Sequence, residues 1–306
     1  MGRKKNKGRA VHGVLLLDKP LNISSNHALQ KVKRLFNAAK AGHTGSLDPL
    51  ASGMLPICLG EATKISAFLL DADKTYRFKC KLGEKTVTGD AEGDVTESRP
   101  FEHIQLADIE KQLASLRGAI MQVPPMYSAL KKDGQRLYDL ARQGIEVERK
   151  PRPVTIYSLD IISFDQGVVE LEARCSKGTY VRTLAQDLGE LLGCGAYVAA
   201  LRRTSVGPFK NEMVTMEQLE KLAEQGAENG AYELDDLLSG IDTGIEDWPK
   251  VELDTDSAYY IKLGQPVQVS RAPTEGKVRI YTDEGFIGIG EIQDDGRVAP
   301  KRMMNL

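Results

Sequence analysis

The sequence predicts a mixed α/β protein of the α+β class, in which helices flank a largely antiparallel sheet and a small β-rich domain ends the chain. Apolar and charged residues alternate at 76–82 and at 168–175, which is the period of a strand with one buried face. A tight turn at 165–167 separates the second strand from another at 155–164, and this spacing favours an antiparallel pair. Beyond residue 249 the chain consists of short apolar runs separated by turn formers, which predicts the small β domain.

Length and composition indicate a soluble protein with two units. The chain has 306 residues, more than a typical single domain, of which 41% are hydrophobic and 27% are charged. We expect a larger unit at 10–245 and a smaller one at 250–306. No apolar run reaches the length that spans a bilayer, and no signal-peptide pattern follows the basic start. We therefore expect a cytoplasmic protein that has no membrane partner.

The first elements follow from an apolar run and from helical spacing. The run at 14–17 predicts a buried strand, and Ser24 or Ser25 is placed to cap the helix that follows, because serine hydroxyls accept bonds from the free amides of a first turn. The buried face of this helix is formed by apolar residues at helical spacing: Ala28, Val32, Leu35 and Phe36. The next segment, 41–53, has neither strand nor helix periodicity and predicts a loop.

The middle of the chain is expected to alternate strands and helices up to a basic insertion. The expected order is a strand at 54–59, a short helix at 61–70, the strand at 76–82, a polar and mobile connection at 83–100, and a helix at 104–116. Residues at about 124–152 are irregular or helical and carry a cluster of lysines and arginines, so we interpret them as a surface insertion.

Periodicity and capping predict the remaining elements. They are the antiparallel strands at 155–164 and 168–175, a helix with Val181, Leu184, Leu188 and Leu191 on one face, a strand at 197–205, a helix capped by Thr215 and Gln218, and C-terminal strands at 266–270, 277–282 and 286–292.

Charge is unevenly distributed, although the formal net charge is only -2. Ten bases between Arg3 and Lys40 face a single acid, Asp18, and the insertion adds a second basic cluster. Such a distribution is typical of a face that binds a polyanion, because phosphates neutralised by basic side chains release their counterions. A solvated basic tail is the alternative interpretation for residues 1–9.

The sequence predicts neither a metal site nor a cofactor. Its four cysteines are dispersed without a C-x-x-C pair, and its four histidines show no ligand spacing. A glycine-rich nucleotide motif is also missing. We therefore expect chemistry that depends on protein side chains alone.

The loop at 41–53 contains the candidate catalytic carboxylate. Asp48 precedes Pro49, whose ring biases the backbone of Asp48 away from helical geometry, so the carboxylate can project from a stiff turn. Taken alone, an Asp-Pro pair is more often a turn or the start of a helix. The residues around the pair decide between these interpretations.

The run GHTGSLDPLASG at 42–53 closely resembles the signature of the TruB family of tRNA pseudouridine synthases, in which the aspartate is the essential catalytic residue. Ser46 and Ser52 stand where threonine is expected, and both retain the hydroxyl. Further matching segments occur in the family's order at 74–76, 123–131, 175–184 and 201–204. The resemblance implies a pseudouridine synthase catalytic domain at 10–245 and, on fewer residues, a PUA-like RNA-binding domain at 250–306. A capping β module without RNA contact is the alternative for the small domain.

The resemblance also implies catalytic roles for three residues. Asp48 would act at the ribose C1′ of the target uridine while the bond to N1 breaks, after which C5 bonds to C1′. A sheltered carboxylate needs a cation to stay ionised, and Arg182 is the candidate, with a surface helical arginine as the alternative. Tyr76 matches a tyrosine that stacks on the target base and is a candidate for proton transfer, with a core aromatic as the alternative.

Five further residues are candidates for binding the substrate. By the same resemblance His43 stacks and hydrogen-bonds at the flipped-out nucleotide, with a turn-stabilising histidine as the alternative. Tyr180 and Leu201 match further pocket residues. Lys19 and Lys131 are also candidates for binding the substrate. The basic helix from Lys31 to Arg34 and the insertion from Lys131 to Arg152 supply candidate contacts that offset the free energy of flipping a base.

The implied substrate is tRNA, and the implied product is pseudouridine at position 55 in the T-loop, recognised by its shape and its extruded bases. We expect a monomer that needs no protein partner and no guide RNA. Two alternatives remain at this stage. One is an RNA-binding or tRNA-folding protein whose chemistry is dispensable, and the other is an enzyme that hydrolyses the glycosidic bond and releases uracil.

Overall fold

The computed structural model describes residues 8–210, 212–229 and 233–306, and a ten-stranded sheet forms its main body. The strands of this sheet are β1 (Gly13–Lys19), β2 (Ala41–His43), β3 (Ala51–Leu59), β4 (Lys74–Leu82), β7 (Gly118–Gln122), β10 (Arg152–Asp165), β11 (Val168–Cys175), β12 (Ala196–Val206), β13 (Phe209–Lys210) and β14 (Val214–Thr215). Their order is β14-β1-β3-β12-β4-β11-β10-β7, with β2 paired to β3 and β13 to β12. Only the β1–β14 and β12–β3 pairs are parallel, so the predicted class and the largely antiparallel sheet are confirmed.

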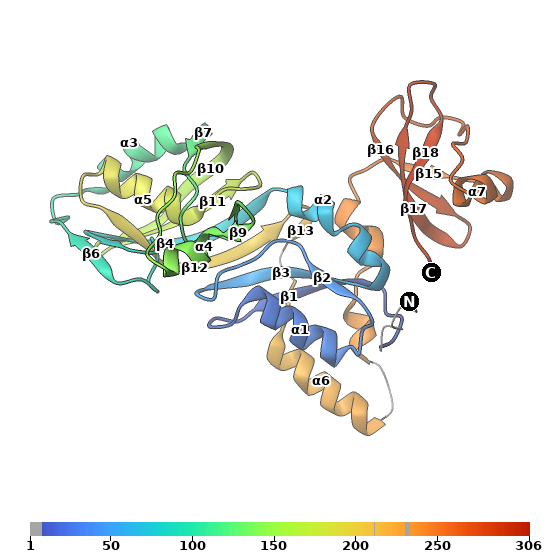
Figure 1. Ribbon diagram of the computed structural model, residues 1–306, viewed down its shortest axis with the longest axis horizontal. Coiled ribbons are helices and arrows are strands. Elements are labelled where there is room, and N and C mark those ends of the chain that lie inside the picture. The colour runs from blue at the N-terminus through green and yellow to red at the C-terminus, as the bar shows by residue number, and fades with distance from the viewer. Residues whose placement is uncertain (1–7, 211, 230–232) are drawn as a thin grey trace.

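Two pairs of helices cover the sheet (Figure 1). The helices α1 (Ser25–Leu35) and α6 (Met216–Asn229) lie beside β1 and β3, and α3 (Leu106–Leu116) and α5 (Val181–Leu191) lie beside the half that contains β10 and β12. The N-caps follow the sequence: the Ser24 hydroxyl accepts the His27 amide, and Thr215 and Gln218 exchange side-chain bonds with each other's amides. Among the described residues, no helix is long and apolar enough to cross a lipid bilayer.

Each helix pair closes its own hydrophobic core. The core under α1 and α6 contains Leu15, Leu17, Ala28, Val32, Leu55, Ile57 and Leu59. The core under α3 and α5 contains Phe78, Cys80, Leu82, Leu171, Leu184, Leu188 and Val198. The alternation predicted at 76–82 is confirmed, because Phe78, Cys80 and Leu82 are buried while Arg77 and Lys79 are exposed. The loop at 44–50 lies where the two halves meet, since it leads into β3, which pairs with β12.

A four-stranded sheet with its own core forms the C-terminal part of the chain (Figure 1). Its elements are β15 (Lys250–Glu252), α7 (Thr255–Lys262), β16 (Lys277–Thr282), β17 (Gly285–Ile292) and β18 (Val298–Met303). The predicted strands at 277–282 and 286–292 correspond to β16 and β17. The predicted strand at 266–270 is wrong, because this segment makes a single bridge, from Val267 to Val298.

The C-terminal sheet is attached to the main body by a shared apolar cluster. Ile289 of β17 is completely buried in a cluster that also contains Ile65 and Leu69 of the main body. At the edge of this contact the Lys277 ammonium lies 4.7 Å from the Phe68 ring centre and 5.4 Å from that of Trp248, the only tryptophan. Trp248 is therefore a natural probe of this junction.

Local expectations failed where polar side chains order the chain. The segment at 83–100 is not a mobile connection but a hairpin of β5 (Glu84–Thr86) and β6 (Val95–Ser98), whose turn is held by side-chain hydroxyls. Both ends of the predicted loop at 41–53 are strand, because they join β2 and β3. The predicted helix at 61–70 is a 3-10 turn, η1 (Gly60–Lys64), followed by α2 (Ser66–Asp71), and the insertion contains β8 (Lys131–Lys132), β9 (Gln135–Arg136) and α4 (Leu137–Arg142).

Replacing Ile289 by alanine should weaken the attachment of the C-terminal sheet. The cavity left in the shared cluster is expected to lower the free energy of unfolding by about 3 kcal/mol. The measurement is urea unfolding followed by Trp248 fluorescence. As a control, Ile162→Ala removes a side chain that is 43% exposed and should change the free energy of unfolding by less than about 0.5 kcal/mol. Equal effects of the two changes would contradict the packing described here.

Candidate active site

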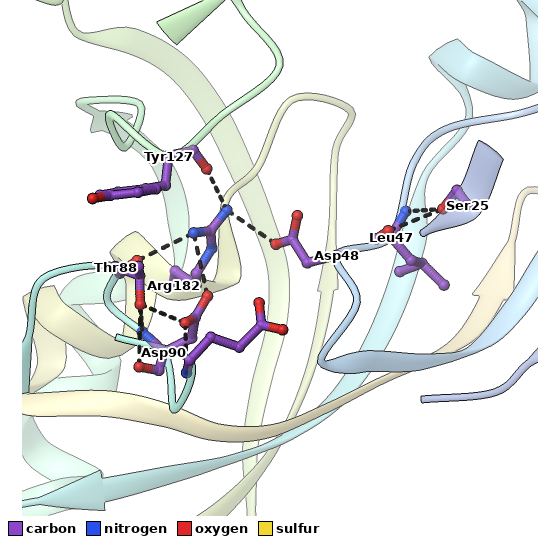
Figure 2. A network of polar contacts seen from close by, with 8 residues as sticks. Ser25, Leu47, Asp48, Thr88, Asp90, Tyr127 and Arg182 are labelled. Atoms are coloured by element: carbon purple, nitrogen blue, oxygen red, sulfur yellow. Dashed lines mark hydrogen bonds and ion pairs between the residues drawn. The ribbon is translucent and has the colours of Figure 1, made fainter. Parts of the chain in front are cut away.

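The loop at 44–50 presents Asp48 in a defined direction. The Ser25 hydroxyl at the start of α1 donates to the Leu47 carbonyl at 2.9 Å and accepts the Leu47 amide at 2.7 Å. The Asn22 amide donates to the Pro49 carbonyl at 2.8 Å, and the Asp48 carbonyl accepts the Ala51 amide at 3.0 Å. Figure 2 shows the result: Leu47 is bound to Ser25 on one side, and the Asp48 carboxylate points to the other side. The backbone on both sides of the carboxylate is thus fixed.

Arg182, in the first turn of α5, lies directly beside Asp48 (Figure 2). Its Nη2 is 3.0 Å from Oδ2 of Asp48 and donates to the Tyr127 carbonyl at 2.7 Å. Its Nη1 is 3.3 Å from Oδ2 of Asp90 and donates to the Thr88 carbonyl at 3.1 Å. The side chain of Arg182 is only 7% exposed, and that of Asp48 is 42% exposed. One buried guanidinium therefore holds a carboxylate whose outer edge remains accessible.

Asp90 is a second carboxylate of the site, and the sequence analysis did not identify it. Its side chain is 2% exposed, and Oδ1 accepts the Thr88 hydroxyl at 2.5 Å and the Glu92 amide at 3.1 Å. The Thr86 hydroxyl also donates to its carbonyl at 2.7 Å. An available signal was the run of threonine and glycine before this aspartate, because such side chains bond to nearby backbone and order a turn.

The surroundings make Asp48 more basic than an ordinary aspartate. Burial raises the pKa of Asp48, and the negative charge of Asp90 raises it further. The charges of Arg182 and Lys19 act in the opposite direction. A carboxylate with a raised pKa is a stronger base and nucleophile than one exposed to water, and the partner guanidinium favours its ionised form.

Tyr76 on β4 faces the same region. It lies half-buried against the core under α5 and is the cross-strand partner of Arg203 on β12. Burial raises the pKa of Tyr76, the charge and hydrogen bond of Arg203 oppose this rise, and the charge of Asp48 adds to it. The phenol is thus within electrostatic reach of both the catalytic candidate and a buried arginine that the sequence analysis did not single out.

Tyr180 and Leu201 complete the group that the fold brings together. The Tyr180 amide at the start of α5 donates to the buried Gln122 side chain at 3.0 Å. Burial raises the pKa of Tyr180, the charge of Arg182 lowers it and the charge of Asp48 raises it. The Tyr180 hydroxyl therefore interacts electrostatically with both groups. Leu201 is buried in the same core as Leu47.

A cleft of about 550 Å³ adjoins this group and is lined by Leu50, Glu92 and Leu201 among others. Pockets of this size commonly hold small ligands. A larger cleft of about 1230 Å³ lies between α2 and β16, where Trp248 and Lys277 line it, and none of the predicted site residues belongs to its lining. Of the predicted site residues, only Leu201 lines the smaller cleft. The smaller cleft therefore adjoins the site, and Asp48, Tyr76 and Arg182 lie outside its lining.

Lys19, His43 and Lys131 occupy different environments. Lys19 is completely buried and donates to the Pro20 and Ile23 carbonyls, both at 2.8 Å. Burial lowers its pKa to about 8, although the charge of Asp48 opposes the change. The ring of His43 is half-buried at the end of β2, and its Nδ1 has no hydrogen-bond partner among the described residues. Lys131 is exposed on β8, away from these contacts. Roles of the three in binding substrate stay predictions.

Three family descriptions match successive parts of the chain. Residues 33–181 match the TruB family pseudouridylate synthase (N terminal domain). Residues 182–246 match the tRNA pseudouridylate synthase B C-terminal domain, and residues 249–304 match Pseudouridine synthase II TruB, C-terminal.

Curated proteins are similar over nearly the whole chain. "tRNA pseudouridine synthase B" of Serratia proteamaculans (strain 568) is 56% identical over 310 residues, covering 99% of this chain and 98% of the relative. The protein of the same name from Nitrosococcus oceani is 54% identical over 304 residues, covering 99% and 97%.

Solved structures share the fold. A chain of a structure titled "Crystal Structure of a Cbf5-Nop10-Gar1 Complex" aligns with a TM-score of 0.74 and 25% identity over 96% of this chain and 85% of that chain. A chain of "Structure of H/ACA RNP bound to a substrate RNA containing 2'-deoxyuridine" aligns with a TM-score of 0.74 and 22% identity, covering 100% and 92%.

Removing the Asp90 carboxylate should destabilise the fold. Asp90→Ala leaves Arg182 without its fully buried partner, and breaking a buried ion pair of this kind is expected to lower the free energy of unfolding by about 3 kcal/mol. The matched control is Asp94→Ala, which changes an exposed aspartate of the same hairpin. Urea unfolding of both variants tests the difference, and equal stability of the two would contradict a structural role for Asp90.

Asp48→Asn should have the opposite effect on stability. Because the pKa of Asp48 is raised in the folded state, its stabilising contribution is present below the ordinary pKa of aspartate, about 3.9, and is lost as the pH rises through the raised value. The variant is therefore expected to gain stability relative to wild type near neutral pH, and this gain should shrink as the pH falls toward the ordinary pKa. Urea unfolding at both pH values measures it, and a gain that grows on acidification would show the sign to be wrong.

Proposed function

The chain belongs to the TruB family of pseudouridylate synthases, and from this premise we propose that it converts a uridine of tRNA to pseudouridine, at position 55 in the T-loop. The observation that carries the proposal is the Asp48 carboxylate, which a buried guanidinium binds at 3.0 Å while 42% of the Asp48 side chain remains exposed. Relatives named for this activity on tRNA are 54% and 56% identical over 99% of the chain.

The reaction is an isomerisation in which all atoms are retained. The bond from C1′ to N1 breaks, a bond from C1′ to C5 forms, C5 loses its proton and N1 gains one. Asp48 acts at the ribose while the base is detached, either by bonding to C1′ or by promoting elimination across C1′ and C2′. Protein groups alone can supply these steps, because the reaction has no net oxidation and no second substrate.

Arg182 favours the ionised form of Asp48, and Asp90 fixes the position of Arg182. When a flipped nucleotide excludes water from the cleft, desolvation raises the pKa of the carboxylate further, and the guanidinium at its side opposes protonation. Asp90 fixes Arg182 from the opposite side and so fixes the direction in which Arg182 presents its charge. Arg182 is therefore an electrostatic partner, and Asp90 positions it.

Tyr76, Tyr180 and Leu201 form the site for the extruded base in this proposal. A half-buried phenol can stack on a pyrimidine and exchange a proton with it, and an aliphatic side chain can pack against its face. His43 would contact the flipped-out nucleotide with the exposed part of its half-buried ring, since its unpaired Nδ1 is buried. Lys19 is proposed to contribute to substrate binding through its charge near Asp48.

We assign residues 10–245 to the catalytic domain and residues 250–306 to a PUA-like domain that binds RNA. The insertion at about 124–152 would lie over the RNA and contact its phosphates through exposed bases such as Lys131. The Tyr127 carbonyl on Arg182 connects the insertion directly to the catalytic group, so RNA bound there is held close to Asp48.

The protein is proposed to act in the cytoplasm as a monomer, on tRNA alone, without a guide RNA or a protein partner. Purified protein incubated with an unmodified T-arm RNA tests this part. Pseudouridine formed without additions supports it. Activity that requires a second RNA or protein rejects it.

Asp48→Asn is expected to lower the single-turnover rate by at least about a thousandfold, because the change removes the reacting charge and keeps the shape of the side chain. Binding of tRNA should remain within about threefold of wild type, since most of the binding free energy comes from phosphate contacts. Mass-spectrometric mapping of pseudouridine and a filter-binding titration measure the two quantities.

Asp94→Asn is the control and should retain the wild-type rate. Undiminished turnover by Asp48→Asn would sink the mechanism. Pseudouridine at another position would reject the assigned target, and release of free uracil would identify hydrolysis instead. If wild-type protein binds the T-arm and forms no product, the RNA-folding alternative is correct.

A further inference from the structure

Arg203 is a charged side chain buried beside the loop that carries Asp48. Its exposure is 1%, and it is the largest of the fully buried side chains among the described residues. Arg182 faces two carboxylates, whereas no carboxylate in the described ranges lies within ion-pair distance of Arg203. Burying an unneutralised guanidinium is costly unless hydrogen bonds satisfy it. Its position therefore requires an explanation.

The guanidinium binds backbone on both sides of the loop that carries Asp48. Nε donates to the Met54 carbonyl of β3 at 2.7 Å, and Nη2 donates to the Gly45 carbonyl of the loop at 3.1 Å. The backbone of Arg203 approaches so closely that a Cβ at Gly53, which has φ of 96°, would lie 2.2 Å from the Arg203 carbonyl oxygen. The arginine thus spans the loop before and after Asp48.

Sheet register places the same side chain beside Tyr76. Arg203 of β12 lies opposite Tyr76 of β4, and residues directly opposite each other on neighbouring strands project from the same face. A guanidinium has only donors, so from this cross-strand position Arg203 can bond to the phenol only at a lone pair of its oxygen. The phenol proton then points away from Arg203. Its other charged and titratable neighbours are Asp48 and the Cys175 thiol.

The other buried base near Tyr76, Lys74, binds backbone carbonyls and is not directed at the phenol. The Lys74 ammonium, which is also buried, donates to the Leu69, Leu70 and Ala72 carbonyls at the end of α2. Burial and, next, the charge of Arg203 lower the pKa of Lys74 to about 8. Arg203 is therefore the permanent positive charge on this side of Tyr76.

We infer that Arg203 is a positioning residue for the proton transfer of the isomerisation, holding the Tyr76 hydroxyl and the Asp48 loop in one rigid frame. The inference rests on the proposed function. The ring atoms N1 and C5 both flank C6, so one phenol oxygen at that edge of the base can reach both.

The proton transfer that Arg203 supports involves only the substrate and Tyr76, and every proton that leaves one of them is accepted by the other. The phenol gives its proton to N1 after the bond to C1′ breaks, and the phenolate accepts the C5 proton after the new bond forms. The base then carries a proton on N1 in place of the one on C5, and Tyr76 returns to its starting state. Arg203 stabilises the transient phenolate because a charge-assisted bond strengthens as negative charge develops on the acceptor.

The alternative is that Arg203 only cross-links the fold, and a double-mutant cycle separates the two roles. Single-turnover rates are measured on T-arm RNA for wild type, Arg203→Gln, Tyr76→Phe and the double variant. Arg203→Gln is expected to slow the reaction about 10- to 100-fold when Tyr76 is present and less than about 2-fold in the Tyr76→Phe background. An equal slowing in both backgrounds overturns the inference.

Two further variants serve as a control and as a replacement in case Arg203→Gln does not fold. Arg99→Gln changes an arginine remote from the site, which pairs with Glu97 at 2.6 Å, and should leave the chemical rate unchanged. If Arg203→Gln does not fold, as judged by urea unfolding, Arg203→Lys keeps the charge and replaces it in the cycle. Slowing by Arg203→Lys that is independent of Tyr76 overturns the inference in the same way.

Titration of Tyr76 provides a readout that does not depend on activity. The ring carbon bonded to the phenol oxygen of Tyr76 is followed by NMR in protein labelled with carbon-13 tyrosine, as the pH is raised. The midpoint is expected to move to higher pH in Arg203→Gln and to stay unchanged in Arg99→Gln. An unchanged midpoint in Arg203→Gln refutes the contact, whereas wild-type protein that forms no pseudouridine refutes the proposed function and leaves this titration valid.

Discussion

The site depends on one guanidinium that is shared between two carboxylates. Arg182 is almost completely buried and holds Asp90 on its inner side and Asp48 on its outer side, with the Thr88 and Tyr127 carbonyls filling its remaining directions. Without this charge, two acids so close together would disfavour each other's ionisation. The arrangement keeps the outer acid available and gives it a fixed orientation, which is the condition for carboxylate chemistry in a cleft.

Buried cations that bind backbone carbonyls recur around Asp48. Lys19 holds the turn before α1, Lys74 holds the end of α2, and Arg203 holds both sides of the Asp48 loop. Charge-assisted bonds of this kind offset the loss of solvation and order segments that have no regular secondary structure. The loops at the site can thus be rigid without being helices or strands, and a rigid loop can place a reacting carboxylate accurately.

The outer parts of the molecule are connected to this centre by specific contacts. The insertion reaches Arg182 through a backbone carbonyl of Tyr127, and the buried Gln122 before it binds the start of α5. The C-terminal sheet packs through Ile289 on the cluster that contains α2, which leads into β4 and Tyr76. The insertion and the C-terminal sheet are therefore both continuous with the elements that carry the site.

Local signals in the sequence accounted for the elements and for part of the site. The alternation at 76–82 marked a strand with one buried face, Ser24 and Thr215 marked helix starts, and a long motif marked the loop of Asp48. The same comparison with a family pointed to Arg182 as a cation for this acid, and the structure brings the two together at 3.0 Å. The segment at 83–100 was misjudged, because its hydroxyls bond to their own turn and its polarity was taken for exposure to water.

By itself the sequence determined which segments bury an apolar face and which loop carries the candidate acid, because amphipathic spacing, capping and turn chemistry act between residues close in the chain. Only the tertiary structure decided that Asp90 would face Arg182 and that Arg203 would lie against Tyr76. Those contacts require the sheet order that sets β12 between β3 and β4. Strand order is selected by packing over the whole molecule, so no local pattern encodes it.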